Sequence, residues 1–205
     1  DFDGVADGGR WDFHDGGGRL DSLPLPALAG ATQVGNAAVA LAALRCLEAR
    51  LPLEREAIER GLQDVRLPGR FQRIAASSGF EWVLDVAHNP DSARVLAANL
   101  ERFPVPGRTI AVCGMLADKD VETVLGVLDP TVDEWIAAGT AGPRSLDDAS
   151  LVARASSVGV TMRSGGPVAA AMLTAAARAR DGDRVVVFGS FHTVGPALEQ
   201  LARGA

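Results

Sequence analysis

The chain has 205 residues, of which 47% are hydrophobic and 22% are charged, and its formal net charge at pH 7 is −6. This length is enough for one large or two small domains, and the hydrophobic content excludes a disordered chain. The lysine and arginine residues form no basic stripe, which excludes nucleic acid as a principal partner.

The sequence favours a cytoplasmic protein that does not bind membranes. Its longest apolar stretches, 37–44 and 168–177, are too short to cross a bilayer, and no basic segment followed by an apolar one marks a signal peptide. Cys46 and Cys113 lie in apolar stretches, so we interpret both as small core residues rather than as a disulfide pair. We expect a monomer in a reducing compartment.

The first part of the chain predicts a small region of strands and helices. Glycine and aspartate are frequent over residues 1–30, with isolated aromatic residues between them, which predicts short strands and turns at the edge of a sheet. Apolar residues then recur at helical spacing over 33–50, and a second helix is predicted over 54–63. The Pro68-Gly69 sequence breaks this pattern, so we place a domain boundary between residues 66 and 67.

Beyond this boundary, short apolar runs alternate with segments of helical periodicity. Strands separated by helices of about ten residues form a mostly parallel, doubly wound sheet. The predicted fold class is therefore α/β, with a Rossmann-like sheet flanked by helices. The predicted strands are 71–76, 81–86, 109–113, 134–138, 160–163 and 184–189, and the predicted helices are 90–102, 119–128, 147–156, 167–180 and 194–202.

The segment from Trp82 to Pro90 is the most informative part of the sequence. An apolar run ends at Asp85, and His88 and Asn89 follow it closely. Asn89 is a suitable helix N-cap and Pro90 suits the first helical position, which puts Asp85 and His88 at the carboxyl end of a strand. Ligands of open α/β sheets bind at such ends, and free N–H groups of a helix N-terminus favour an anion such as phosphate. The alternative is a solvated loop with a capping asparagine.

Short motifs in a fixed order connect the chain to a known family. In this order and at this spacing they resemble the folylpolyglutamate synthase/dihydrofolate synthase family, within the Mur-ligase-like ATP-dependent amide ligases. The resemblance covers essentially the whole chain. The motifs are GATQVGNAA at 30–38, LPGRFQ at 67–72, LDVAHNP at 84–90, GMLADKD at 114–120 and FGSFHTV at 188–194.

The resemblance implies a domain organisation. Members of the family have an ATPase domain with a P-loop, magnesium ligands and a carbamylated lysine, followed by a smaller α/β domain. This chain contains no G-x-x-x-x-G-K-[ST] sequence. We therefore expect residues 1–66 to be the C-terminal portion of the ATPase domain and residues 67–205 to be the Rossmann-like ligase domain. The magnesium ligands are expected outside this chain, which we expect to be inactive by itself.

The resemblance also implies roles for individual residues. Asn36 matches an asparagine that contacts ATP, since an amide suits an adenine edge, although a helix cap is the alternative. Arg70 can reach a phosphate or stack on a base, or it is an exposed linker arginine. Asp85 matches an ATP-contacting aspartate and can accept from ribose hydroxyls. His88 matches a histidine expected near the phosphates, and it is the catalytic candidate.

Further candidates lie on the substrate side. Ser190 and His192 follow a predicted strand and are interpreted as a glutamate-side or interdomain element, with a simple strand-end turn as the alternative. Lys119, the only lysine in the chain, can bind a carboxylate or phosphate, or pair with Asp118 and Asp120. We predict no metal ligand in this chain.

The function implied by the resemblance is ligation of L-glutamate to a folate or dihydropteroate carboxylate, with ATP and Mg²⁺, through an acyl phosphate. Two alternatives remain open: another Mur-type amino-acid ligase, and a non-catalytic module that binds adenine nucleotide. A Rossmann oxidoreductase is excluded because no G-x-G-x-x-G follows a strand. The choice between dihydrofolate and polyglutamate synthesis depends on a pterin pocket expected outside this chain.

Overall fold

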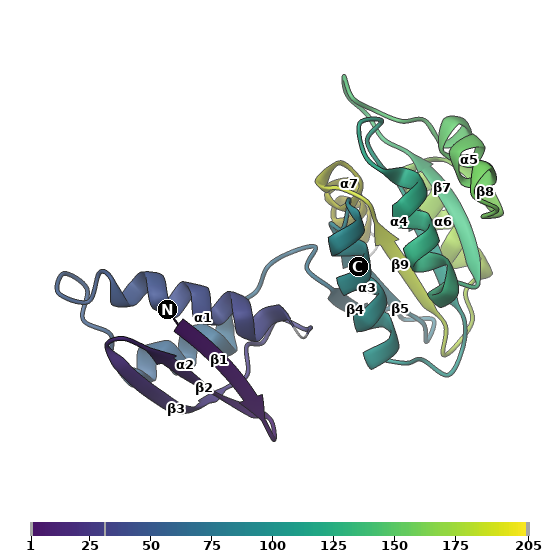
Figure 1. Cartoon of the computed structure of the whole chain (residues 1–205). Helices are drawn as coiled ribbons and strands as arrows, with labels where there is room; N and C mark the ends of the chain where they lie inside the picture. Colours follow the sequence, from purple (N-terminus) through teal and green to yellow (C-terminus); the bar gives the residue numbers. More distant parts are fainter. Residues whose placement is uncertain (1, 31, 204–205) are drawn as a thin grey trace. The chain divides into compact units, whose positions relative to one another are not determined.

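The computed structural model describes residues 2–30 and 32–203 (Figure 1). The chain divides into two compact units, Asp1–Leu67 and Pro68–Ala205. Each unit has its own hydrophobic core. Among the described residues, no helix combines the length and apolar character needed to cross a membrane. The identity of the first unit as part of an ATPase domain stays a prediction.

The first unit contains an antiparallel sheet with two helices packed against it (Figure 1). Trp11 and Phe13 of the middle strand point to the same face, because side chains alternate along a strand, and they share a core with both helices. The predicted short strands and turns are present, and within the described residues these strands form a sheet of their own. The elements are β1 (Phe2–Asp7), β2 (Arg10–Asp15), β3 (Gly18–Pro24), α1 (Thr32–Arg45) and α2 (Arg55–Asp64).

Helix α1 is shorter than the sequence predicts. The apolar pattern continues to residue 50, but the helix ends at Arg45 and turns follow. Cys46 is exposed, so our interpretation of it as a core residue is wrong, and Leu47 is also exposed. Helices in proteins are stabilised mainly by packing of an apolar face. An apolar pattern with nothing to pack against therefore does not extend the helix.

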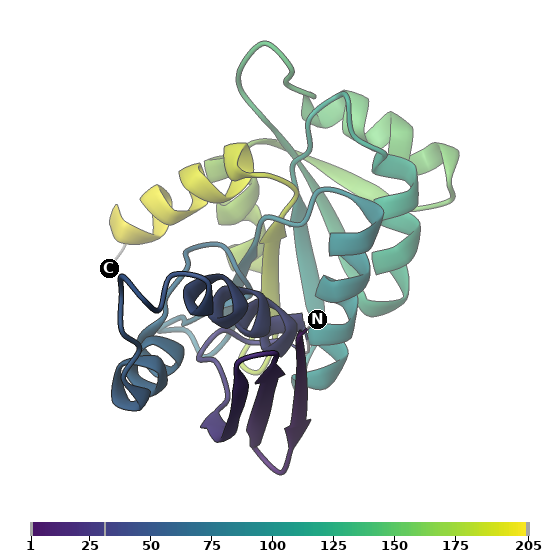
Figure 2. The same cartoon turned by 60° about the vertical axis from the view of Figure 1, so that its left-hand side comes forward.

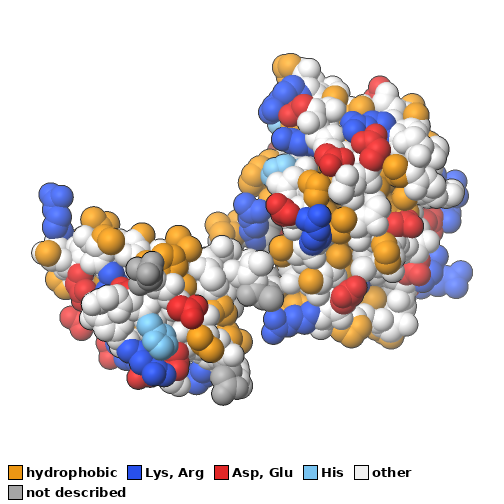
Figure 3. Space-filling model, viewed as in Figure 1, with side chains coloured by type: hydrophobic (Ala, Val, Ile, Leu, Met, Phe, Trp, Pro, Cys, Tyr) orange, Lys and Arg blue, Asp and Glu red, His pale blue; other side chains and the backbone are white. Residues whose placement is uncertain are grey.

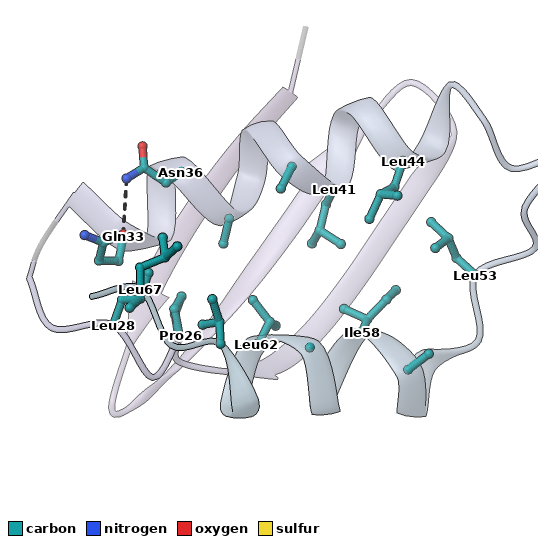
Figure 4. Close-up of a pocket in the computed structure, with 15 residues that line it drawn as sticks. Pro26, Leu28, Gln33, Asn36, Leu41, Leu44, Leu53, Ile58, Leu62 and Leu67 are labelled. Carbon is teal, nitrogen blue, oxygen red and sulfur yellow. Dashed lines mark hydrogen bonds between the residues drawn. The ribbon is translucent and has the colours of Figure 1, made fainter. Parts of the chain in front are cut away.

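An apolar cleft of about 390 Å³ lies between α1 and α2 (Figure 4). Leu41 and Leu44 of α1 face Ile58 and Leu62 of α2 across it. The described part of this unit also carries most of the large apolar side chains that remain in water. These exposed residues are Phe2, Val5, Val39, Leu44, Leu47, Leu51 and Leu67, against Val158, Leu173 and Phe191 in the second unit.

The second unit is built around one mixed sheet, whose described strands follow the order β4-β5-β9-β6-β7-β8. Strand β4 runs antiparallel to β5, and every other neighbouring pair is parallel. Helices α3, α4 and α5 pack on one face, and α6 and α7 pack on the other (Figures 1 and 2). This confirms the predicted α/β fold class. The elements are β4 (Gln72–Ala75), β5 (Glu81–Asp85), α3 (Pro90–Arg102), β6 (Thr109–Cys113), α4 (Val121–Leu128), η1 (Asp129–Thr131), β7 (Glu134–Gly139), α5 (Asp148–Ser157), β8 (Met162–Pro167), α6 (Val168–Arg178), β9 (Arg184–Phe188) and α7 (Phe191–Arg203).

Most predicted elements of this unit are confirmed, with shifts at their ends. Helix α3 and strand β6 have the predicted bounds, whereas β8 lies slightly later than predicted. Helix α7 begins at Phe191 rather than at residue 194. The reason is that the main-chain oxygen of Ser190 accepts the N–H groups of Thr193 and Val194, which starts the helix directly after the strand.

A buried arginine joins elements at the amino edge of this sheet. Arg184, the first residue of β9, is 3% exposed. Its guanidinium donates to the main-chain oxygens of Leu100 (3.3 Å) and Phe103 (2.7 Å) near the end of α3, and to Oγ1 of Thr109 (3.0 Å) on β6. Burial lowers the pKa of Arg184, and the charge of Glu81 opposes that shift. One side chain thus supplies donors to a helix end and to a neighbouring strand.

Replacement of Arg184 with methionine is expected to lower the free energy of unfolding by about 2–4 kcal/mol, because buried acceptors lose their donor. Urea unfolding followed by circular dichroism measures this change. The control is Arg180→Met at an exposed position, which is expected to change stability by less than about 0.5 kcal/mol. Equal unfolding midpoints for the two variants would contradict a structural role for Arg184.

Candidate functional site

The carboxyl ends of neighbouring parallel strands meet at one edge of the second unit. The register places Asp85 beside Phe188, and Phe188 beside Cys113, so β5, β9 and β6 end in one row. Ligands of open parallel sheets bind at this edge, which we call the carboxyl edge. The segments that leave the sheet there are 86–90, 114–120 and 189–194.

Asp85 is half-buried at the carboxyl edge, and main-chain groups bind both of its carboxylate oxygens. Oδ1 accepts from the N–H of Ala87 (2.8 Å), and Oδ2 accepts from the N–H of Phe71 (2.9 Å). Burial raises the pKa of Asp85, while these hydrogen bonds and the charge of Arg70 oppose the shift. Asp85 therefore fastens the turn before β4 to the end of β5, and its remaining lone pairs can accept from a ligand.

The turn at Gly69 and Arg70 has a left-handed backbone conformation and close neighbours, which together favour glycine. Gly69 has a φ of +72°, and a Cβ there would lie 2.9 Å from Cγ1 of Val194 and 3.0 Å from Cγ1 of Val86. The main-chain oxygen of Gly69 accepts from the N–H of Val86 (2.9 Å). The side chain of Arg70 remains exposed, where a guanidinium can reach a phosphate or stack on a base.

His88 is half-buried, and its ring is oriented by the strand end that precedes it. Nδ1 lies 2.9 Å from the main-chain oxygen of Val86. A carbonyl oxygen can only accept, so this contact assigns a proton to Nδ1. Nε2 is then an acceptor in the neutral ring and a donor in the imidazolium. Nε2 is therefore the atom that His88 can offer to a ligand.

The N-terminus of α3 is capped by its own side chains. Oδ1 of Asn89 accepts the N–H of Ser92 (2.9 Å), and Oγ of Ser92 accepts the N–H of Asn89 (3.1 Å), which forms a capping box. Pro90 has no N–H, and Ala93 donates its own to the main-chain oxygen of Asn89. The predicted N-cap role of Asn89 is confirmed, and the cap takes the N–H of Ser92. A phosphate contact at the N–H of Asp91 stays a prediction.

Ser190 lies between the ends of β9 and β6 and is 6% exposed. Its Oγ lies 3.1 Å from Oγ1 of Thr193, and Oγ1 of Thr193 donates to the main-chain oxygen of Gly114 (2.5 Å). Gly189 has a φ of +123°, and a Cβ there would overlap the main-chain oxygen of Gly114. Glycine at this position therefore permits the close approach that fixes Ser190.

The other substrate-side candidates are less constrained. His192 is exposed on the first turn of α7, next to Phe191, which is 66% exposed. Nζ of Lys119 lies 3.5 Å from Oδ2 of Asp118, which is the pairing that the sequence left open. Arg154 of α5 donates to the main-chain oxygen of Lys119 (3.1 Å). The backbone of Lys119 is thus held, while its ammonium pairs with a neighbour.

Asn36 belongs to α1 of the first unit. Helix α1 begins at Thr32, so Asn36 lies inside the helix and the helix-cap alternative is wrong. Its Nδ2 donates to Oε1 of Gln33 (3.2 Å), and both residues contribute to the lining of the apolar cleft (Figure 4). Its contact with an adenine edge stays a prediction.

Charged side chains are dispersed rather than clustered. Figure 3 shows acidic and basic side chains interspersed over the visible face of each unit. Over residues 2–30 and 32–203, no group of three or more His, Cys, Asp or Glu side chains is arranged to hold a metal ion. At the carboxyl edge, Lys119 and Arg144 both pair with Asp118, at 3.5 Å each.

The fold and the motif positions define a ligase domain of known type. A match to the family described as "Mur ligase, glutamate ligase domain" spans residues 69–191, so the chain belongs to the Mur ligase family. Over 191 residues the chain is 40% identical to the dihydrofolate synthase/folylpolyglutamate synthase of Escherichia coli K12. That match covers 93% of this chain and 42% of the relative.

Solved structures give the same assignment. The structure of E. coli FolC in complex with DHPP and ADP matches all of this chain and 47% of its own, with a TM-score of 0.86 and 38% identity. A bifunctional folylpolyglutamate synthase/dihydrofolate synthase with Mn, AMPPNP and L-glutamate bound matches 98% of this chain and 46% of its own, with a TM-score of 0.84 and 37% identity. Within the Mur ligase family, the chain is thus similar over most of its length to these folylpolyglutamate and dihydrofolate synthases. It spans less than half the length of these relatives.

Sequence reasoning missed the residues that hold the site residues in place. Thr193 and Gly114 lie inside the recognised motifs, but only the tertiary contact between them indicates their role. One sequence signal could have indicated this role: Thr193 carries a hydroxyl three residues after Ser190, close to a predicted helix start. Such hydroxyl groups usually satisfy nearby backbone or side-chain partners.

The stability conferred by Asp85 is expected to depend on pH. Because the folded-state pKa of Asp85 is raised, its contribution is fully present below its ordinary pKa and is lost as the pH rises through the raised value. The free energy of unfolding of the wild type relative to Asp85→Asn should therefore fall between about pH 4 and about pH 7. Urea unfolding of both proteins at the two pH values measures this difference in the free energy of unfolding. The contributions of titratable groups that both proteins share cancel in it. A difference that stays constant or increases with pH would contradict the raised pKa.

Proposed function

We propose that the protein containing this chain is an ATP-dependent ligase that joins L-glutamate to the carboxylate of a folate or a dihydropteroate. The observation that carries this proposal is the alignment of the strand ends bearing Asp85, Ser190 and the GMLADKD segment at one sheet edge. The names of the relatives and the ligands in their structures, ADP, AMPPNP and L-glutamate, support the proposal.

The proposed reaction has two steps. A carboxylate oxygen of the pterin substrate takes the γ-phosphoryl group of ATP, which releases ADP and gives an acyl phosphate. The amino group of glutamate then attacks the carbonyl carbon, phosphate leaves, and the nitrogen loses a proton as the amide forms. Phosphoryl transfer depends mainly on positioning and charge neutralisation. Exclusion of water then protects the acyl phosphate from hydrolysis.

The proposed nucleotide contacts use groups that the fold leaves available. Asp85 has lone pairs for the ribose hydroxyls, and the exposed guanidinium of Arg70 suits a phosphate or the base. Asn36 is proposed for the adenine edge. His88 offers Nε2 toward the phosphates, where an imidazole can accept or donate according to its charge. Ser190, His192 and Lys119 are proposed for the glutamate side.

Magnesium is proposed to accompany ATP, with its ligands outside this chain. The described residues contain no group of three or more acidic, histidine or cysteine side chains arranged for a metal ion.

The first unit is proposed to be the C-terminal portion of a P-loop ATPase domain. Its exposed apolar residues and its cleft support this, since large apolar surfaces usually contact other protein.

This chain contains no P-loop sequence, so we expect the 205-residue chain alone to release no ADP with dihydropteroate, glutamate and MgATP. A coupled ADP-release assay tests this, and measurable turnover by the isolated chain would contradict it.

Two alanine substitutions test the site in the full-length enzyme. His88→Ala is expected to lower kcat by about 100-fold or more, through loss of a positioned imidazole. Asp85→Ala is expected to raise the KM for ATP by about tenfold or more, through loss of charged acceptors. Glutamate-dependent ADP release gives both constants. The control is His14→Ala, an exposed residue of β2, which is expected to behave as wild type.

The same assay decides whether the proposed substrates are correct. Replacing L-glutamate with other amino acids should abolish turnover in the wild type. Turnover with diaminopimelate or alanine in place of glutamate would instead indicate another Mur-type ligase. Wild-type rates for both His88→Ala and Asp85→Ala would remove these residues from the site.

A further inference from the structure

The hydroxyl groups of Ser190 and Thr193 form a buried hydrogen-bonded pair at the carboxyl edge. Thr193 is fully buried on the first turn of α7. Its Oγ1 lies 2.5 Å from the main-chain oxygen of Gly114 and 3.1 Å from Oγ of Ser190. The three oxygen atoms thus form a chain from β6 to the residue that follows β9.

The direction of each hydrogen bond in this chain follows from the number of protons available. A carbonyl oxygen only accepts, so the single hydroxyl proton of Thr193 is donated to Gly114. The bond between the two hydroxyls must then use the proton of Ser190, with Oγ1 of Thr193 as the acceptor. With its proton directed inward, Oγ of Ser190 can offer only lone pairs to any group outside.

The packing around Thr193 opposes a reversal of this arrangement. A Cβ on Gly114 would lie 2.8 Å from Oγ1 and 3.0 Å from Cγ2 of Thr193, so the threonine fits closely against the backbone. The main-chain oxygen of Ser190 also accepts the N–H of Thr193 (3.1 Å). Rotation of the threonine hydroxyl away from Gly114 would leave a buried carbonyl without this donor, which is costly.

We propose that Thr193 is a positioning residue that makes Ser190 a hydrogen-bond acceptor, and that Ser190 binds the amino group of the incoming amino acid. This inference rests on the proposed ligase function. The carboxylates of glutamate and the phosphates of ATP are themselves acceptors, so an oxygen that offers only lone pairs disfavours them. An amine supplies N–H donors, and one held through N–H can keep its nitrogen lone pair directed at the carbonyl carbon.

Substitution of Thr193 in the full-length ligase tests this proposal through substrate-specific constants. In Thr193→Val the proton of Ser190 is released and competes with the amine, so the KM for L-glutamate should rise about tenfold. The kcat and the KM for ATP should stay within about twofold of wild type. Thr193→Ser retains the hydroxyl and should restore the KM for glutamate. Because KM does not depend on the folded fraction, partial unfolding cannot produce this pattern.

A double-mutant cycle asks whether Thr193 acts through Ser190. Ser190→Ala should raise the KM for glutamate, and adding Thr193→Val should change it by less than about twofold, because the group on which Thr193 acts is gone. The matched control is Thr109→Val, another buried threonine of the second unit, whose hydroxyl accepts from Arg184 at the opposite edge of the sheet. It should leave the KM for glutamate unchanged.

Each other outcome is decisive. A glutamate KM that is unchanged in Thr193→Val or in Ser190→Ala overturns the inference and leaves the ligase function standing. A rise in the KM for ATP alone overturns it as well, since the hydroxyl pair would then serve the nucleotide. Full additivity in the double mutant assigns Thr193 an independent structural role. Absence of glutamate-dependent turnover in the wild type refutes the proposed function itself.

Discussion

Parallel, in-register pairing of β5, β9 and β6 is the constraint on which the candidate site depends. Because Asp85, Phe188 and Cys113 share one row, the loops after these strands leave the sheet together. The strands are buried on both faces, since helices cover both sides of the sheet. A shift of one residue in any strand would turn its side chains to the other face and move its loop away from the others.

Many polar groups at this edge are first used to hold the edge itself. Both oxygens of Asp85 bind main-chain N–H groups, Nδ1 of His88 contacts a main-chain carbonyl, and Asn89 with Ser92 caps α3. Each side chain is thereby oriented by its own backbone surroundings. The groups that stay available to a ligand are the remaining lone pairs of the Asp85 oxygens, Nε2 of His88 and the exposed guanidinium of Arg70. Because these side chains are already oriented, ligand binding has a smaller entropic cost.

The two units differ in how completely they bury their apolar surface. In the second unit the central strands are enclosed, and burial strongly raises the pKa of Cys113, so its thiol stays protonated. In the first unit a small sheet and two helices leave a cleft and several exposed leucines. A small domain buries a lower fraction of its surface than a large one, which accounts for part of this difference. The extent of the exposed apolar surface agrees with a unit that contacts further protein.

The sequence alone determined the α/β class, the order of the elements and the segments that hold the candidate residues, because burial periodicity and capping signals are local. It failed where packing decided the outcome: the apolar pattern beyond Arg45 does not continue the helix, and Cys46 is exposed. It predicted Asn89 as the N-cap of α3, but not that Ser92 completes a capping box with it. Only the tertiary structure brought Thr193 to Gly114, 79 positions away in the chain. No local pattern encodes such a contact, because it arises from pairing between distant strands, and that pairing decides which atoms of a motif residue remain available to a ligand.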